Sequence, residues 1–276
     1  MLGHVTATGN LTLQAAGISQ QNASNFSVAG TSVLSADSTH DISMNQAGNV
    51  WGGSVSVTSA RDVSLRSSAG LATGAITAQR DLTLTAAGDV SQSGVWSVQG
   101  TTTVNAGSGQ VSLNQSGNAL TGALSITGGA VDVSSTSALL LGQVNATSLQ
   151  VQASGGVSQQ NATALTVSGT TSLTADATHD VLLGQAGNSL TGTITVGTVR
   201  DLTLANTGAL QLGSLSVNRH LSLSATGAIS QSAAWNVGGT SQFTSTSGSV
   251  TVDRSDNSLA GAVSLSGTQA SVRTSG

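Results

Sequence analysis

Residues 18–57 read ISQQNASNFSVAGTSVLSADSTHDISMNQAGNVWGGSVSV, and residues 157–196 read VSQQNATALTVSGTTSLTADATHDVLLGQAGNSLTGTITV. The two stretches share one pattern of residues at an offset of 139. Self-similarity at a fixed distance is the signature of architectures that stack one structural unit on the next. The duplicated stretch therefore predicts a repeat protein rather than a globular domain.

A diverged form of the same pattern lies after each copy. Residues 90–126 read VSQSGVWSVQGTTTVNAGSGQVSLNQSGNALTGALSI, and residues 229–265 read ISQSAAWNVGGTSQFTSTSGSVTVDRSDNSLAGAVSL. We call the first form A and the diverged form B. The super-repeat is roughly 70 residues long, and residues 1–276 are predicted to form a single solenoid segment. Its super-repeats span about 18–89, 90–156, 157–228 and 229–276.

Three landmarks keep a nearly constant spacing, the length of one super-repeat, through all four copies. They are the Gly-Thr pairs at 30, 100, 169 and 239, the asparagines Asn49, Asn118, Asn188 and Asn257, and the glycines Gly53, Gly122, Gly192 and Gly261. Such a fixed spacing is expected where each residue occupies a corner of a stacked coil. We expect the four glycines to serve corners that need a positive φ or a close approach of two backbones.

A shorter period of about 20 residues runs inside each super-repeat. Apolar-polar-apolar triplets begin at Ile42, Val63 and Leu82, one such period apart in each case. Alternation with period two places the apolar side chains inside and Ser or Thr outside. The sequence predicts an all-β fold, a right-handed parallel β-helix (β-solenoid) of roughly 12–14 coils.

The composition excludes several classes of site. The chain has no cysteine, proline, lysine or glutamate, and only 7% of its residues are charged. A P-loop needs lysine, an HExxH zinc site needs glutamate and a thiolate metal site needs cysteine. We expect no cofactor-binding residues and no metal site. Because the arginines are scattered and the net charge is −4, we expect no nucleic-acid partner, and no apolar run is long enough for membrane insertion.

The repeat motif ISQ…V-x-GT…N-x-x-x-G…V-x-L of residues 11–276 resembles that of filamentous-haemagglutinin-like exoproteins of two-partner secretion. The resemblance implies a large adhesin, haemolysin or contact-dependent toxin, secreted or held at the Gram-negative cell surface. It also implies an outer-membrane two-partner-secretion transporter as a partner. The repeat starts at Leu11 and stops within a copy at Gly276, so we expect a segment cut from a longer array.

One pair of polar clusters is a catalytic candidate. Thr39-His40-Asp41 with Asp37 recurs as residues 178–180 with Asp176. A histidine beside carboxylates can act in acid-base chemistry on polysaccharides. Neighbouring strand residues point to opposite faces, however, and Asp-Ser-Thr is a turn sequence whose side chains bond their own backbone. We favour the turn and assign no catalytic residue.

Two further sets of residues have a binding and a structural interpretation. Arg61-Asp62, Arg80-Asp81 and Arg200-Asp201 each precede an apolar-polar-apolar triplet, which predicts an external ladder of ion pairs between coils. Arg61 and Arg80 could instead bind an anionic glycan. Trp96 and Trp235 hold equivalent B positions and Trp51 replaces leucine, so we expect packing rather than a sugar-stacking platform.

The favoured function is a structural shaft or spacer segment of an adhesin-like exoprotein, without enzymatic activity. The first alternative is an adhesive module that binds a host-cell glycan or protein through one face of the solenoid. The second is a β-helix enzyme that acts on polysaccharide. Exposed aromatic side chains on one face would favour the first alternative, and a unique acidic cleft would favour the second.

Overall fold

The computed structural model describes residues 1–275 as parallel β-strands joined by short turns. These described residues contain no helix that is long and apolar enough to cross a membrane. They form two compact units, unit 1 over Met1–Ser137 and unit 2 from Ala138 onward. The strands of each unit wind into stacked coils, about 13 turns in all. The prediction of an all-β, parallel β-solenoid is confirmed, and right-handed winding stays a prediction.

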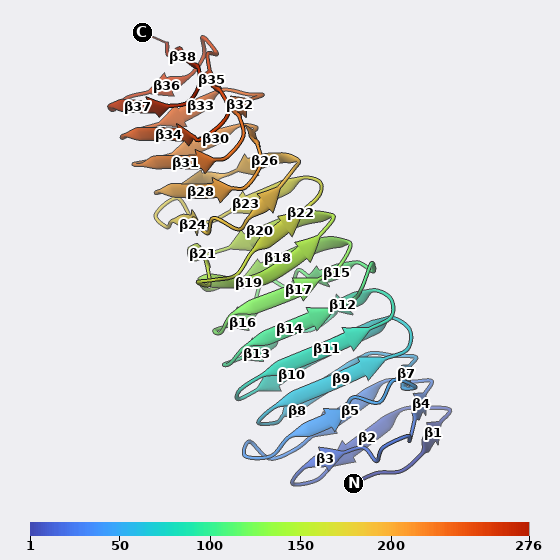
Figure 1. The fold of residues 1–276 in the computed structure, drawn as a ribbon. Coiled ribbons are helices and arrows are strands. Elements are labelled where there is room, and N and C mark those ends of the chain that lie inside the picture. The colour runs from blue at the N-terminus through green and yellow to red at the C-terminus, as the bar shows by residue number, and fades with distance from the viewer. Residues whose placement is uncertain (276) are drawn as a thin grey trace. The chain divides into compact units, whose positions relative to one another are not determined.

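Unit 1 contains two long parallel sheets, and the chain alternates between them (Figure 1). The first sheet is ordered β2 (Leu11–Gln14), β5 (Ser32–Ser35), β8 (Val55–Ser59), β10 (Leu71–Ala78), β12 (Val90–Gln92), β15 (Val111–Leu113) and β18 (Ala130–Ser135). The second is ordered β3 (Ile18–Ser19), β6 (Ile42–Met44), β9 (Val63–Ser67), β11 (Leu82–Ala86), β14 (Thr102–Asn105) and β17 (Leu124–Thr127). Shorter strands complete the coils, namely β1 (Val5–Ala7), β4 (Phe26–Val28), β7 (Val50–Trp51), β13 (Trp96–Val98) and β16 (Ala119–Leu120).

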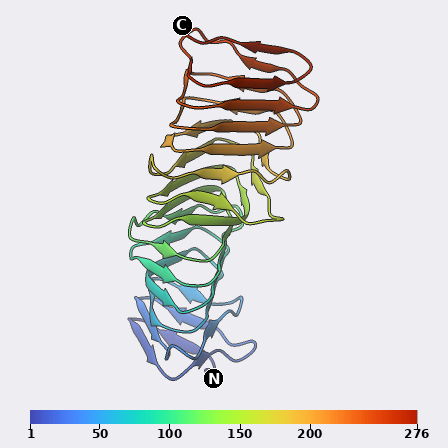
Figure 2. The same cartoon turned by 90° about the vertical axis from the view of Figure 1, so that its left-hand side faces the viewer.

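Unit 2 repeats this plan, and Figure 2 shows its strands stacked edge to edge in green through yellow to red. Its first sheet is ordered β20 (Ser148–Ala153), β23 (Thr171–Thr174), β26 (Thr193–Val196), β29 (Leu210–Leu212), β32 (Ile229–Gln231), β35 (Val250–Val252) and β38 (Ala270–Val272). Its second is ordered β19 (Leu139–Ala146), β21 (Val157–Gln159), β24 (Val181–Leu183), β28 (Leu202–Asn206), β31 (Leu221–Ala225), β34 (Ser241–Ser245) and β37 (Val263–Ser266). The shorter strands are β22 (Leu165–Val167), β25 (Ser189–Leu190), β27 (Thr198–Val199), β30 (Leu215–Val217), β33 (Trp235–Val237) and β36 (Ser258–Leu259).

The apolar triplets build the core as predicted from their period. In β9 and β11, Val63 pairs with Leu82 and Leu65 pairs with Leu84, and all four side chains are buried. Ser64 lies between the two inward residues of β9 and faces outward. It pairs with Thr83, the outward residue at the same level of β11. Like side chains therefore stack in columns through successive coils, and a register slip of one residue would turn each column inside out.

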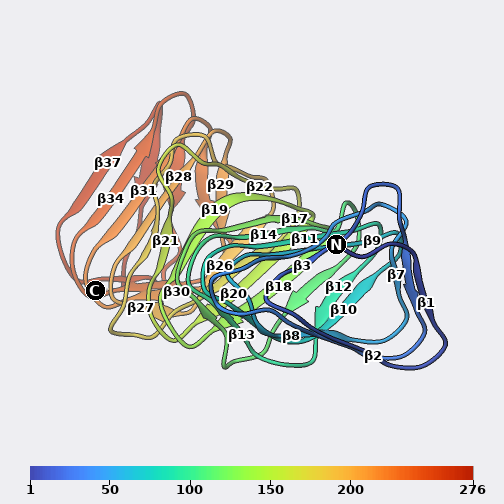
Figure 3. The ribbon, with the colours of Figure 1, turned by 90° about the horizontal axis from the view of Figure 1, so that it is seen from below.

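The A and B copies start in opposite sheets of each unit. The A copy of unit 1 starts in β3 of the second sheet, and its B copy starts in β12 of the first sheet. Between these starts the chain passes through β6, β9 and β11 of the second sheet, so one super-repeat makes about three and a half turns. Unit 2 does the same from β21 to β32. Figure 3 shows the turns from below, so that this alternation can be followed in unit 1.

The four landmark glycines allow the backbones of neighbouring coils to approach closely, which confirms one of the two reasons predicted for them. A Cβ on Gly53 would lie 2.6 Å from the backbone of Gly30 in the preceding coil. Gly122, Gly192 and Gly261 lie in the same way against Gly100, Gly169 and Gly239. The other expected reason, a positive φ, is wrong for these four, because Gly107 is the glycine with a positive φ among the described residues.

Candidate functional site

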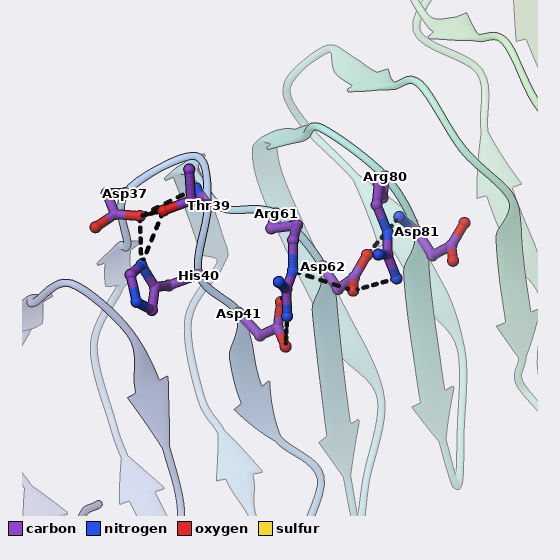
Figure 4. A network of polar contacts seen from close by, with 8 residues as sticks. All are labelled: Asp37, Thr39, His40, Asp41, Arg61, Asp62, Arg80 and Asp81. Carbon is purple, nitrogen blue, oxygen red and sulfur yellow. Dashed lines mark hydrogen bonds and ion pairs between the residues drawn. The ribbon is translucent and has the colours of Figure 1, made fainter.

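The first catalytic candidate is a turn closed by its own side chains. Between β5 and β6, the Asp37 Oδ1 atom accepts hydrogen bonds from the Thr39 backbone N–H at 3.0 Å and the Thr39 hydroxyl at 2.7 Å. His40 Nδ1 lies 2.7 Å from the same oxygen (Figure 4). Asp41 bonds to Arg61 of the next coil. The structure therefore brings His40 to Asp37 and not to Asp41, and it confirms the turn geometry.

Unit 2 reproduces this turn between β23 and β24. Asp176 Oδ1 accepts from the Thr178 backbone N–H at 2.8 Å and from its hydroxyl at 2.6 Å. His179 Nδ1 stands 3.6 Å from the Asp176 carboxylate, and about half of each of these two side chains is exposed. The cluster is therefore a repeated surface turn rather than a single cleft.

The predicted ladder of ion pairs is present in unit 1. Arg61 donates its Nε and Nη2 groups to the two carboxylate oxygens of Asp41, at 2.8 and 2.9 Å. Arg80 Nη2 then lies 2.9 Å from Asp62 Oδ2 in the preceding coil (Figure 4). Asp81 continues the row by accepting from the Thr101 backbone N–H and hydroxyl. Each arginine thus joins its own coil to the aspartate of the coil before it.

Unit 2 contains the equivalent ladder. Arg200 donates two hydrogen bonds to Asp180, at 2.7 and 2.6 Å. Arg219, which the sequence analysis had not singled out, donates two to Asp201, at 3.1 and 2.5 Å. We call each row the charged corner of its unit. The charged corner of unit 1 consists of Asp37, His40, Asp41, Arg61, Asp62, Arg80 and Asp81, and that of unit 2 of Asp176, His179, Asp180, Arg200, Asp201, Arg219 and His220.

Hydrogen bonding lowers the pKa of several aspartates in these corners. The contacts of His40 and Thr39 lower the pKa of Asp37 to about 2. The guanidinium of Arg61 lowers the pKa of Asp41, and the same effect acts from Arg200 on Asp180 and from Arg219 on Asp201. These carboxylates therefore stay ionised at neutral pH. Because the pairs lie at the surface, water and salt screen them strongly.

The tryptophans lie in the core, as expected from their repeat positions. Trp96 and Trp235 are 0% and 1% exposed, and their indole N–H groups donate to Thr73 Oγ1 and to the Gly213 carbonyl. Trp51 is 5% exposed and stacks on Phe26 with ring centroids 6.1 Å apart. Buried rings cannot present a face to a sugar, so they provide no stacking platform.

Sequence reasoning missed the partner of the landmark asparagines. In each copy the glutamine of the ISQ or VSQ triplet exchanges two side-chain hydrogen bonds of 2.6–2.9 Å with the asparagine of the following coil. We call these pairs amide clips; they are Gln20–Asn49, Gln92–Asn118, Gln159–Asn188 and Gln231–Asn257. The recurrence of glutamine at the third position of all four triplets was the signal that could have found them.

Each asparagine of a clip joins three coils. Asn118 Oδ1 also accepts from the backbone N–H of Trp96 in the preceding coil, and Asn118 Nδ2 donates to the Leu113 carbonyl of its own coil. The Asn118 carbonyl accepts from the Thr136 N–H in the following coil. The four landmark asparagines therefore have a structural role. Each one hydrogen-bonds to buried polar groups that the sheets leave unpaired.

A last repeated polar feature is a buried hydroxyl without a partner. Ser32, Thr102, Thr171 and Ser241 each follow the Gly-Thr landmark, are at most 1% exposed, and have no hydrogen-bond partner for the hydroxyl oxygen. The described residues also contain no group of three or more His, Cys, Asp or Glu side chains that could hold a metal ion.

Comparison with known proteins gives one result. A family model described as "Repeats of unknown function (DUF5649)" matches residues 1–58, 60–127, 128–197 and 199–266. The four matches cover most of the chain. The last three agree in length with the predicted super-repeat and the first is shorter, and the boundaries of all four differ in phase from those predicted above. No curated protein and no solved structure matches the chain.

Proposed function

The chain belongs to the family of repeats of unknown function (DUF5649), and from this premise we propose that it is a structural spacer segment without enzymatic activity. One observation carries the proposal. The glutamines and asparagines of the amide clips and most arginines and aspartates of the charged corners bond to neighbouring coils, and Asp37 and Asp176 close their own turns. The candidate catalytic and binding residues of the repeats are therefore engaged in contacts within the solenoid.

The absence of a distinct cleft in the polar clusters supports the same proposal. Asp37, Thr39 and His40 occupy a turn that unit 2 repeats, whereas a solenoid enzyme concentrates unlike residues at one place. A hydrolase would also need a nucleophile or an activated water held beside the imidazole. The contacts of His40 are to Asp37 and Thr39. We therefore propose that these turns stabilise coil corners.

The resemblance of residues 11–276 to filamentous-haemagglutinin-like exoproteins supports a finer proposal. We propose that the parent protein is an adhesin-like exoprotein that leaves a Gram-negative cell through an outer-membrane two-partner-secretion transporter. The segment would then lie outside the cell or at its surface and carry other parts of the protein away from the membrane. An antibody against this solenoid should label intact source cells, and labelling that requires permeabilised cells would contradict this location.

The spacer function is tested by lengthening the chain. Each solenoid coil advances by about 4.8 Å, so a second copy of residues 18–156, about seven turns, should lengthen the protein by about 34 Å. Small-angle X-ray scattering of the wild-type and lengthened chains measures the maximum dimension. A matched insertion of a flexible Gly/Ser linker of equal length serves as the control. An AB insert that leaves the maximum dimension unchanged would contradict the proposal.

The proposed lack of enzymatic activity is tested by a separate measurement. Purified chain incubated with pectin-like and other polysaccharides should release no new reducing ends and no unsaturated sugars. The double variant His40→Ala/His179→Ala is the control for any activity that is detected. Activity in the wild type that disappears in this variant would replace the spacer by an enzyme.

A second function, adhesion through one face, is supported by a row of outward hydroxyls in unit 1. The row runs in register through the second sheet and consists of Ser19, Ser43, Ser64, Thr83, Thr103 and Ser125. A glycan array would test it. Saturable binding that Ser64→Leu abolishes would favour an adhesive module over a spacer.

A further inference from the structure

The direction of the hydrogen bonds between coils determines how this protein responds to a pulling force. Within each unit the strands pair in parallel with those of the next coil, as β9 pairs with β11 along all five of its residues. The strands run across the stack of coils, and the hydrogen bonds between them run along it. A force along the stack therefore loads the bonds of the outermost coil one after another, and that coil peels away without shearing a whole sheet.

Each coil that peels away releases much more chain than the length it occupied. A coil of roughly 20 residues adds about 4.8 Å to the stack, whereas the same residues span about 66–72 Å when extended, which is more than ten times as much. The coils farther along the stack stay folded, because each coil contacts only its neighbours. A solenoid can thus lengthen under load while most of it remains intact.

The amide clips oppose this peeling at regular intervals. Asn118 is fully buried, and its Oδ1 atom accepts from the side chain of Gln92 and the backbone N–H of Trp96 in the coil before. The Asn118 carbonyl accepts from the backbone N–H and the hydroxyl of Thr136 in the coil after. One residue therefore ties together three coils, and several buried bonds must break when its coil leaves the stack.

A coil between two clips is tied less firmly. Residues 70–89 form a coil without a clip, and the ion pair of Arg80 with Asp62 in the coil before is exposed and therefore weak. The pairing of β10 with β8 is also irregular between Thr73 and Ile76. Once a clip has opened, the coils as far as the next clip should follow in the same event.

We propose that the protein is an extensible tether that unwinds under tension in steps of one super-repeat, with the amide clips as the stops between steps. This role rests on the spacer function proposed above, because a spacer transmits the force between the two parts that it separates. Successive clip asparagines lie one super-repeat apart. A super-repeat of roughly 70 residues spans about 230–250 Å when extended and about 17 Å when folded, so each step should lengthen the tether by about 220 Å.

The composition favours rewinding when the tension falls. The chain contains no proline and no cysteine, so neither prolyl isomerisation nor disulfide exchange delays refolding. A released super-repeat regains its contacts from the folded coil beside it and needs no distant part of the chain. The tether should therefore shorten again on relaxation.

Single-molecule stretching of the full chain tests the proposal. A cysteine added at each terminus provides two unique attachment points for an optical trap, because the chain has no other cysteine. The wild type should lengthen in repeated steps of about 220 Å and shorten again when the force is lowered. A single unfolding event for the whole chain or for each compact unit would overturn the proposal. So would steps of one coil, about 60 Å each.

Asn118→Ala tests the role of a clip. It should merge the steps on either side of the lost clip into one of about 440 Å. Asn114→Ala, at an exposed position four residues earlier, is the matched control and should keep the steps of the wild type. Circular dichroism should show that both variants are folded, and Gln92→Ala opens the same clip from its other side if Asn118→Ala does not fold. Wild-type steps in a folded variant without this clip would overturn the proposal.

Failure of the tether and failure of the spacer can be told apart, because small-angle scattering measures length without force. If the AB insert lengthens the protein but the chain unfolds in one event, the tether is overturned and the spacer stands. If the insert adds no length, both are overturned.

Discussion

Gln20 and Asn49 exchange two side-chain hydrogen bonds across adjacent coils. Gln20 Nε2 donates to Asn49 Oδ1 at 2.6 Å, and Asn49 Nδ2 donates to Gln20 Oε1 at 2.9 Å. The strands beside this clip are short, since β3 and β6 pair through Ile18 with Ile42 and Ser19 with Ser43. The clip therefore supplies bonds between coils where the sheet supplies few.

Removal of one clip should destabilise the protein strongly. Asn118→Ala leaves the Gln92 amide and the Trp96 backbone N–H buried without this partner. Each unsatisfied buried group costs about 1–3 kcal/mol, so we expect a loss of at least about 3 kcal/mol in the free energy of unfolding. Chemical denaturation measures this loss. Asn114→Ala, at an exposed position four residues earlier, is the control and should change stability little. Equal effects of the two variants would show that the clip contributes nothing.

Replacement of the unpaired buried hydroxyls should stabilise the protein. The Thr102 and Thr171 hydroxyls lie in the core without partners, and their inward neighbours in adjacent coils are apolar, Leu82 and Leu124 beside Thr102. Valine has nearly the shape of threonine without the polar atom. Thr102→Val/Thr171→Val should therefore raise the free energy of unfolding by about 1 kcal/mol or more per site.

Thr103→Val provides the matched control for this substitution. Thr103 lies next to Thr102 in β14 but faces outward and is exposed, so its hydroxyl is hydrated. Its replacement should bring no comparable gain. If Thr102→Val lowered the melting temperature, the buried hydroxyl would have a partner in solution, such as an internal water.

The sequence predicted the architecture because the period of its apolar residues is a direct consequence of coil geometry. Val63, Leu65, Leu82 and Leu84 had to face one interior once their spacing matched one coil. The close approach at Gly53 and the burial of Trp96 followed from their fixed positions in the repeat. Each of these predictions depends on the local sequence pattern and on side-chain size, and both can be read directly from the sequence.

The half-turn alternation of A and B copies could not be predicted in the same way. The lengths of the super-repeat and of one coil already imply that each super-repeat contains a half-integer number of turns. The lengths of the loops, however, determine in which of the two sheets Val90 lies. The amide clips likewise depend on which coil corner faces Gln92. Hydrogen-bond partners that lie 26 residues apart are set by the stacking of the coils, so the recurrence of the glutamines marks them as repeated residues but does not identify their partners.

The strained turn beside each A-form clip gives another test. Ala23 and Ala162 have φ values of 57° and 60°, in the left-handed region that disfavours residues with a Cβ. Glycine removes this penalty of about 1–2 kcal/mol but loses more backbone entropy on folding. We expect Ala23→Gly/Ala162→Gly to stabilise the protein by roughly 0.5 kcal/mol per site. Ala29→Gly, at a position without positive φ, should destabilise it, and the thermal midpoints of the two variants separate these effects.

The stacked glycines should tolerate no side chain. A Cβ on Gly122 would overlap the carbonyl oxygen of Gly100, and one on Gly192 would overlap that of Gly169. The obstacle is backbone, so relief requires the two coils to move apart. Gly122→Ala should therefore cost on the order of 3 kcal/mol, near the upper range for overpacking. Gly9→Ala is the control, because nothing lies within 4 Å of its added Cβ. A Gly122→Ala protein as stable as the control would contradict the close stacking.

Stability should fall in acid because carboxylates of the charged corners are ionised in the folded state. The pKa of Asp37 in the folded protein is about 2, below the value of about 3.9 for an unfolded aspartate. Its contribution is thus fully present above about pH 4 and is lost as the pH falls towards the folded pKa. The lowered pKa values of Asp176 and Asp201 act with the same sign.

Asn in place of Asp37 and Asp176 keeps an oxygen that can accept from the threonine N–H but does not titrate. The free energy of unfolding of Asp37→Asn/Asp176→Asn should therefore fall less steeply than that of the wild type between about pH 4 and pH 2. Denaturation curves measured across this range give both slopes. Asp132→Asn/Asp253→Asn, which removes two negative charges outside the charged corners, controls for net charge. If the corner variant and the wild type lost stability with equal slopes, the Asp37 and Asp176 carboxylates would not be the source of the acid sensitivity.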